Sequence, residues 1–123
     1  MTAELILSEW LEATQSRRTE LLAYAKSPLP VDISERHADL DMAIRAEDDL
    51  GQLLSDAESF LAQYTAQAVL AMREKYSDLS AKERELMIKA EVKDIRRVVD
   101  GIDVTSRTVK SRIFAILNAN RSR

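Results

Sequence analysis

The chain has 123 residues, of which 46% are hydrophobic and 32% are charged, and its net charge is −3 at pH 7. Two glycines and two prolines are too few for the turns of a β-sandwich, so the composition predicts an all-α protein folded as one domain over 1–123. Cysteine is absent, which excludes disulfides, thiolate metal sites and cysteine nucleophiles. The N-terminal stretch predicts neither a signal peptide nor a membrane span, and we expect a soluble, cytoplasmic protein without membrane contacts.

Charge is distributed unevenly along the chain. Residues 1–62 hold 13 acidic and five basic residues, whereas residues 63–123 hold eight acidic and 13 basic residues. The acidic residues end at Asp103, and five basic residues follow it: Arg107, Lys110, Arg112, Arg121 and Arg123. This asymmetry indicates either a basic surface for a polyanion or two halves of one fold that attract each other.

Two helices are predicted in the first part of the chain. The first and shorter one covers 3–26, because Thr2 is a typical N-cap residue and two prolines at 28 and 30 end the helix. The second covers 34–77 and begins near Asp32 or Ser34. Its apolar stripe recurs at three- and four-residue steps and consists of Leu50, Leu54, Ala57, Leu61, Tyr64, Ala68 and Met72, widened by Leu53 and Phe60. Gly51 weakens this helix and allows a bend.

A third helix is predicted over 81–119, starting after a capping box formed by Ser80 and Glu83. Asp100 and Gly101 form a turn dipeptide, which is an alternative signal for a break at that point. The heptad pattern passes through Gly101 without a shift, and this favours one continuous helix. The second and third helices are then expected to form a long antiparallel hairpin.

The heptad of the third helix predicts an extended packing seam. Its apolar members are Ile88, Val92, Ile95, Val99, Ile102, Val109, Ile113 and Ile116. A hairpin with one shorter helix leaves much aliphatic surface in water, so we expect the seam to join copies of the chain in an oligomeric helical bundle. The alternative is that the seam is the intramolecular core.

No residues in the sequence form a catalytic constellation, and the chain is predicted not to be an enzyme and to need no metal or cofactor. His37 is the only histidine, and without a second histidine or a cysteine it is expected to be a surface residue rather than a ligand. Glu47, Asp48 and Asp49 are consecutive, so their side chains point in different directions on a helix and indicate a solvated acidic face rather than a metal site.

The basic residues of the last third of the chain give the stronger functional signal. Lys89, Lys93, Arg96, Arg97, Arg107 and Lys110 lie on or beside the outer side of the third helix, interrupted by Asp100 and Asp103, and Phe114 and Arg121 follow. Bases stack on aromatic rings while phosphates contact Arg and Lys, so this pattern favours single-stranded nucleic acid. Alternatively, Phe114 packs against the first helix.

The run "KSRIFAI" from Lys110 to Ile116 resembles the C-terminal segment of the T-even phage recombination mediators, the UvsY-type proteins. The resemblance implies a small, helical, oligomeric protein that binds single-stranded DNA. It also implies a role in loading a RecA-like recombinase in place of single-strand binding protein. Lys110, Arg112 and Phe114 are the residues in the shared run that the resemblance implies for DNA contact or for assembly.

Two other functions are consistent with the sequence. A small acidic phage-type inhibitor would bind a host protein through the cluster Asp39, Asp41, Glu47, Asp48 and Asp49. A structural assembly factor would bind neither nucleic acid nor a host protein. Salt-sensitive binding to single strands distinguishes the mediator from both alternatives.

Overall fold

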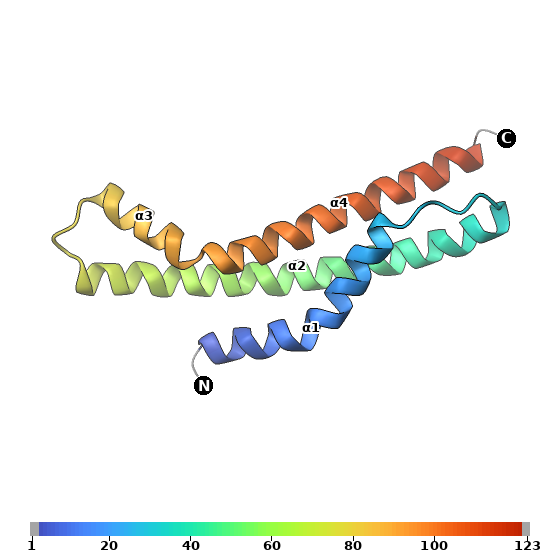
Figure 1. Ribbon diagram of the computed structural model, residues 1–123. Helices are drawn as coiled ribbons and strands as arrows, with labels where there is room; N and C mark the ends of the chain where they lie inside the picture. The colour runs from blue at the N-terminus through green and yellow to red at the C-terminus, as the bar shows by residue number, and fades with distance from the viewer. Residues whose placement is uncertain (1–2, 122–123) are drawn as a thin grey trace.

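The computed structural model describes the backbone of residues 3–121 and the side chains of residues 6–118. The described residues form four helices, namely α1 (Ala3–Lys26), α2 (Ile33–Lys75), α3 (Ala81–Glu91) and α4 (Lys93–Arg121) (Figure 1). The all-α prediction is confirmed. The first two helices begin and end within two residues of the predicted positions, whereas the predicted third helix is divided into α3 and α4.

An antiparallel pair of long helices forms the spine of the molecule. α2 has 43 residues and is about 65 Å long, and it packs against α4 and, at its C-terminal end, against α3. α1 crosses this pair and contacts both α2 and α4 (Figure 1). The expected arrangement of a shorter helix followed by a long helical hairpin is therefore observed.

N-cap residues explain where α2 and α3 begin. The carboxylate of Asp32 accepts a hydrogen bond from the backbone N–H of Ser34 at 3.0 Å, so Asp32 is the N-cap of α2. The hydroxyl of Ser80 accepts one from the N–H of Glu83 at 3.2 Å and caps α3. The predicted start at 81 is thus correct.

The core lies where three helices meet. It comprises Leu21 and Ala25 of α1, Ala43, Ala46, Leu50, Leu53 and Ala57 of α2, and Ile102 and Val109 of α4. Three of the five α2 residues are alanines, and their small side chains allow the facing helices to approach closely. The predicted α2 stripe starts at Leu50, so it missed the buried turns around Ala43 and Ala46.

The heptad residues pack inside the chain. Val92, Ile95, Ile102, Val109 and Ile116 are buried, and Ile88, Val99 and Ile113 are half-buried. Because α2 covers this face, the structure corresponds to the intramolecular alternative rather than to a seam between copies. An intermolecular seam at these residues would require α4 to leave α2. Oligomerisation itself stays a prediction.

The helical break between α3 and α4 falls at Val92 rather than at Gly101. Val92 has φ −95° and ψ 5°, but its N–H still donates to the carbonyl of Ile88 at 3.1 Å and its carbonyl accepts from the N–H of Arg96 at 3.0 Å. The chain therefore kinks without losing these two hydrogen bonds, and α3 diverges from the line of α4 (Figure 1). Gly101 lies within α4, as the continuous heptad register indicated.

Candidate nucleic-acid interface

A basic hollow lies at the junction of α3 and α4. It is lined by Lys89, Lys93, Arg96, Arg97 and Asp100 and has a volume of about 340 Å³. Lys89, Lys93 and Arg97 follow one another at four-residue steps, so they lie on one side of the chain across the kink at Val92. The structure thus brings four of the predicted nucleic-acid residues together around one hollow, which we call the basic hollow.

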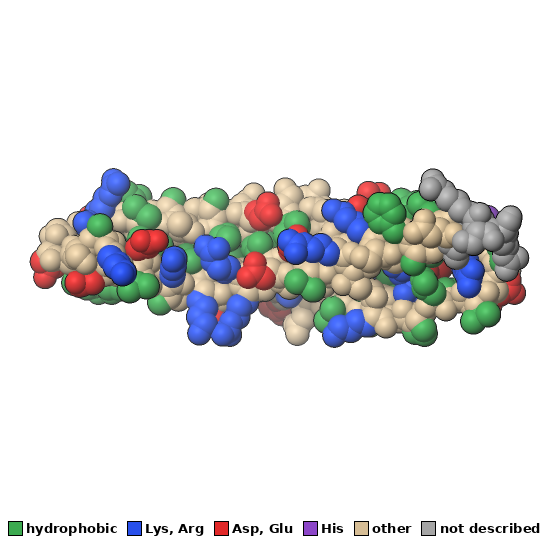
Figure 2. Space-filling model, turned by 90° about the horizontal axis from the view of Figure 1, so that it is seen from above, with side chains coloured by type: hydrophobic (Ala, Val, Ile, Leu, Met, Phe, Trp, Pro, Cys, Tyr) green, Lys and Arg blue, Asp and Glu red, His purple; other side chains and the backbone are tan. Residues whose placement is uncertain are grey.

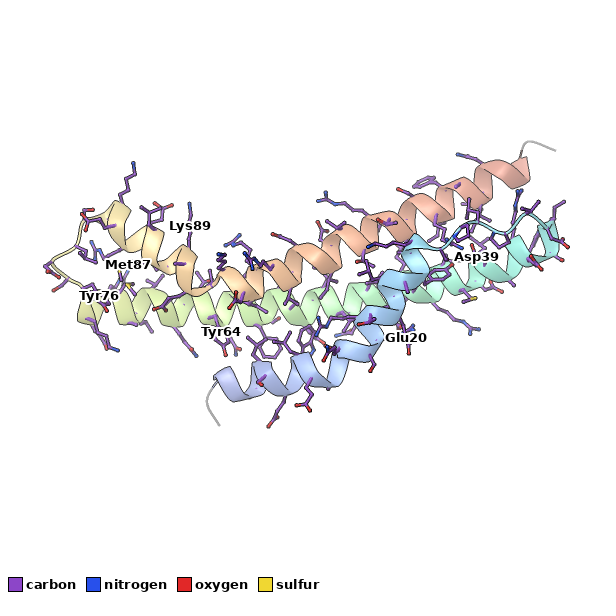
Figure 3. All side chains as sticks on the ribbon, viewed as in Figure 1. Glu20, Asp39, Tyr64, Tyr76, Met87 and Lys89 are labelled. Atoms are coloured by element: carbon purple, nitrogen blue, oxygen red, sulfur yellow. The ribbon has the colours of Figure 1, made fainter. Side chains whose placement is uncertain are left out.

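Most of the positive charge in the basic hollow is not neutralised by carboxylates. Lys89 lies 3.6 Å from Glu85 in an exposed pair, which contributes little in water. Among the residues that the structure describes, Lys93, Arg96 and Arg97 form no ion pair. Lys89 projects from the side of α3 that faces away from α2 (Figure 3). Figure 2 looks onto this side and shows Lys and Arg side chains gathered over α3 and the first half of α4. The hollow therefore attracts anions.

The predicted residues farther along α4 whose side chains the structure describes are also exposed, with one exception. Arg107 pairs with Asp103 at 2.8 Å, which neutralises one of the two acids that interrupt the basic face. Lys110 is exposed, and the ring of Phe114 is 67% exposed rather than packed against α1. The side chain of Arg121 lies outside the described residues.

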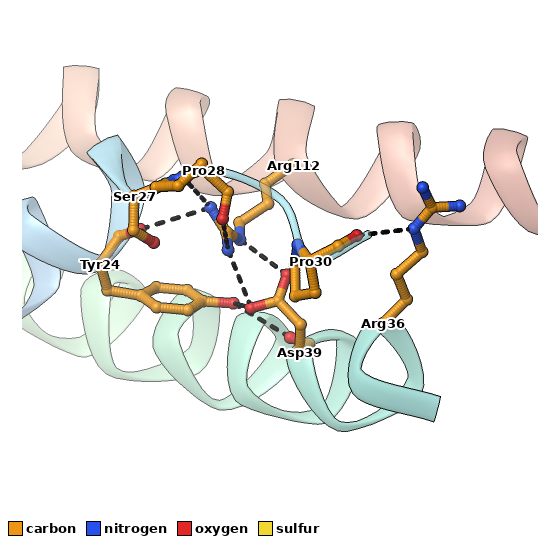
Figure 4. Close-up of polar contacts among 7 residues, drawn as sticks. All are labelled: Tyr24, Ser27, Pro28, Pro30, Arg36, Asp39 and Arg112. Carbon is orange, nitrogen blue, oxygen red and sulfur yellow. Dashed lines mark hydrogen bonds and ion pairs between the residues drawn. The ribbon is translucent and has the colours of Figure 1, made fainter. Parts of the chain in front are cut away.

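Arg112 is the exception, because it is buried between α1, α2 and α4. Its guanidinium donates to both carboxylate oxygens of Asp39, from Nε at 2.8 Å and from Nη2 at 3.0 Å (Figure 4). It also donates to the carbonyls of Ser27 at 2.5 Å and Pro28 at 3.2 Å, just after the C-terminus of α1. Both charged side chains are only 6% exposed. The nucleic-acid assignment of Arg112 is therefore corrected, since its donors face protein groups.

Tyr24 completes this buried cluster, which we call the polar lock. Its ring lies under the Arg112 guanidinium at 4.6 Å, and its hydroxyl donates to the Asp39 carboxylate at 2.7 Å. Burial and then the hydrogen bond to Asp39 raise the pKa of Tyr24 to about 12. Burial by itself would lower the pKa of Arg112, but the hydrogen bond and charge of Asp39 outweigh it and the pKa is raised. Arg112 therefore stays charged in the fold.

The acidic cluster is partly used within the fold. Asp39 belongs to the polar lock, and Asp49 accepts hydrogen bonds from Arg17 of α1, one of them from Nε at 2.9 Å. Asp41 and Asp48 are exposed and Glu47 is half-buried. The face proposed for an inhibitor thus has fewer free carboxylates than the sequence indicates. No group of three or more potential metal ligands occurs within the described part of the chain.

The positions of Asp39 and Arg112 in the sequence predict the polar lock, although the distribution of charge along the chain does not. Asp39 lies four residues before Ala43 and seven before Ala46, and Arg112 lies three after Val109 and four before Ile116. These spacings place both charges on the buried faces of their helices. A charged residue on an apolar helix face predicts a buried partner of opposite charge.

Comparison of the chain with protein-family models, with curated proteins and with solved structures finds no match. None of the helices in the described residues has the length and apolar character needed to cross a membrane.

Proposed function

We propose that this protein binds single-stranded DNA through the basic hollow and acts as a recombination accessory protein that helps to load a RecA-like recombinase. The observation that supports DNA binding is the set of four cations around one hollow, three of which have no carboxylate partner among the residues that the structure describes. Phosphate oxygens are the natural ligands of such a cluster, and their contacts displace counterions from the strand.

The face of α4 beyond the basic hollow favours a single strand over a duplex. Arg97 and Phe114 are 17 positions apart on one helix, or about 26 Å. The exposed ring of Phe114 offers a stacking surface, which is accessible to an unpaired base but not to bases inside a duplex. Lys110, one turn before Phe114, supplies a nearby cation for the backbone.

The resemblance to the T-even mediators supports the accessory role, although its shared run serves two purposes in this fold. Lys110 and Phe114 lie on the surface, whereas Arg112 belongs to the polar lock. We propose that the protein also self-associates, as the resemblance implies. The contact must use surface other than the buried heptad residues.

DNA binding is tested by the anisotropy of a labelled single-stranded oligonucleotide at low and physiological salt. The triple variant Lys93→Ala, Arg96→Ala, Arg97→Ala should bind more weakly, and its slope of log affinity against log salt should fall by about 2, since each lost phosphate contact removes about 0.7. The control is Arg45→Ala, Arg73→Ala, Lys75→Ala, which removes equal charge from exposed positions of α2. Equal effects of the two variants would contradict the assignment of the basic hollow.

The accessory role needs its own measurement. An oligonucleotide already covered by single-strand binding protein is offered to a RecA-like recombinase, and the time to full recombinase coverage is recorded. The protein should shorten this time, and the basic-hollow triple variant should not. If the protein binds DNA but leaves the time unchanged, DNA binding stands and the mediator role does not.

A further inference from the structure

A second concave surface lies between α1 and α4, next to the basic hollow. Its volume is about 630 Å³, within the range of ligand-binding clefts. The buried side chains of Leu50 and Ile102 form its floor, and the partly exposed side chains of Leu22 and Val104 form its sides. We call it the apolar groove.

Three cations border the apolar groove. Arg18 and Lys26 of α1 line one side, and Arg97 of α4 lines the other, while Asp100 is the single acidic residue among the described lining residues. The three cations form no ion pair within the described part of the chain. Arg18 instead donates to the hydroxyl of Thr14 at 3.1 Å and to the carbonyl of Leu11 at 2.8 Å, and its guanidinium lies 5.9 Å from the centre of the Trp10 ring, so these contacts do not neutralise its charge.

The shape of the apolar groove suits a helix. On α1 the lining residues Arg18, Leu22 and Lys26 follow at four-residue steps, which gives a straight ridge about 12 Å long, or two helical turns. On α4 the lining includes Gly101, where nothing lies within 4 Å of an added Cβ. A docked helix can therefore approach the backbone of α4 closely at this position.

We propose that the apolar groove binds an acidic amphipathic helix of a partner protein. Leucine-like side chains of the partner contact the apolar floor, and its carboxylates contact Arg18, Lys26 and Arg97. A nucleic acid fits the groove less well, because the described residues that line the groove include no aromatic side chain on which a base could stack. This inference goes beyond the proposed DNA binding, since the two surfaces share only Arg97 and Asp100.

The test uses a labelled synthetic peptide of about 15 residues, with leucines at the i, i+3, i+4 and i+7 positions of one helix face and glutamates on the other positions. Its anisotropy is measured against the full-length protein. Two control peptides have either the same composition with the leucines spread around the helix or lysine in place of glutamate. The acidic amphipathic peptide should bind, more weakly at high salt, and both controls should bind at least about tenfold more weakly.

Variants locate the peptide on the protein. Val104→Asp should weaken binding about tenfold or more, because an unpaired carboxylate would be buried against leucine side chains. Leu70→Asp is the matched control, since Leu70 is 57% exposed and Val104 is 58% exposed, and Leu70 does not line the groove. Lys26→Glu at an exposed position should weaken binding about fivefold at low salt, and it provides a second variant with little risk to folding.

A reciprocal pair of variants separates this inference from the proposed function. Lys26 lines only the apolar groove, and Lys93 lines only the basic hollow. Lys26→Glu should affect the peptide and leave oligonucleotide binding within about twofold, whereas Lys93→Glu should do the opposite. If Lys26→Glu weakens oligonucleotide binding as strongly as Lys93→Glu, the groove belongs to the nucleic-acid site and the inference is overturned.

Two further outcomes would also overturn the proposal. The first is a peptide that does not bind, or that binds Val104→Asp and the unmodified protein equally. The second is a fall in the sedimenting mass of the protein alone on Val104→Asp, because a second copy of the chain would then be the occupant of the groove. Circular dichroism and the urea midpoint of each variant confirm that the fold is retained.

Discussion

Removing one member of the polar lock should destabilise the fold strongly. In Arg112→Met the carboxylate of Asp39 stays buried without its bidentate partner, and the carbonyls of Ser27 and Pro28 each lose a donor. Breaking a buried pair by removing one partner costs about 3–5 kcal/mol. Since domains of this size unfold with about 5–15 kcal/mol in total, the single change removes about a fifth of the stability or more.

Urea unfolding followed by far-ultraviolet circular dichroism measures this effect. With an m-value of about 2 kcal/mol/M, the midpoint of Arg112→Met should fall by about 2 M while the m-value stays the same. The matched control is Arg107→Met on the same helix. Arg107 pairs with Asp103 at 2.8 Å but is 76% exposed, so this control should cost less than about 0.5 kcal/mol.

A double-mutant cycle tests whether the cost comes from the unpaired charge. Arg112→Met combined with Asp39→Asn removes both charges and keeps both side-chain volumes nearly unchanged, so the part of the lost stability that comes from the unpaired carboxylate should return. The reasoning is refuted if Arg112→Met costs no more than the Arg107→Met control, or if the double variant loses as much as the two single variants together. Under conditions where Arg112→Met is folded, its oligonucleotide affinity should match that of the unmodified protein.

Three further predictions follow from the same structure. The pKa of Tyr24 is raised to about 12, so the stability that its protonated hydroxyl contributes is complete below pH 10 and is lost as the pH rises towards 12. The urea midpoint of Tyr24→Phe should therefore change less between pH 10 and pH 12 than that of the unmodified protein. Gly51→Ala should raise the free energy of unfolding by about 0.5–1 kcal/mol, since nothing lies within 4 Å of the added Cβ, and an unchanged midpoint contradicts this. Phe114→Ala should weaken oligonucleotide binding about tenfold with an unchanged salt slope, and the exposed Leu117→Ala should not.

Local sequence signals were sufficient to predict most helix boundaries. The two prolines after α1, Asp32 at the start of α2 and Ser80 at the start of α3 each act through one or two neighbouring backbone groups. Such signals need no knowledge of the tertiary fold. The kink at Val92 has no comparable signal, because no proline or glycine accompanies it and its hydrogen bonds are retained.

The candidate site was predicted in part. The basic residues of α3 and α4 were found from charge and helical spacing, but the hollow that they line was not predicted. Arg112 was misassigned because counting charges along the chain cannot pair it with Asp39, 73 positions away. The apolar groove depends on how α1 crosses α4, and neither helix shows that crossing in its own pattern.

Local stability should differ between the part of the molecule that holds the polar lock and α3 at the opposite end of the hairpin. Arg112 links α1, α2 and α4 through its hydrogen bonds, whereas α3 has no fully buried residue and, among the residues that the structure describes, makes no contact with α1. Backbone amides of α3 should therefore exchange with solvent through local opening, while those of α4 near Val109 exchange only on global unfolding. The basic hollow lies on the boundary between these two regimes. An anion bound there contacts both α3 and α4, so it orders the weaker segment and part of its binding free energy is used for that ordering.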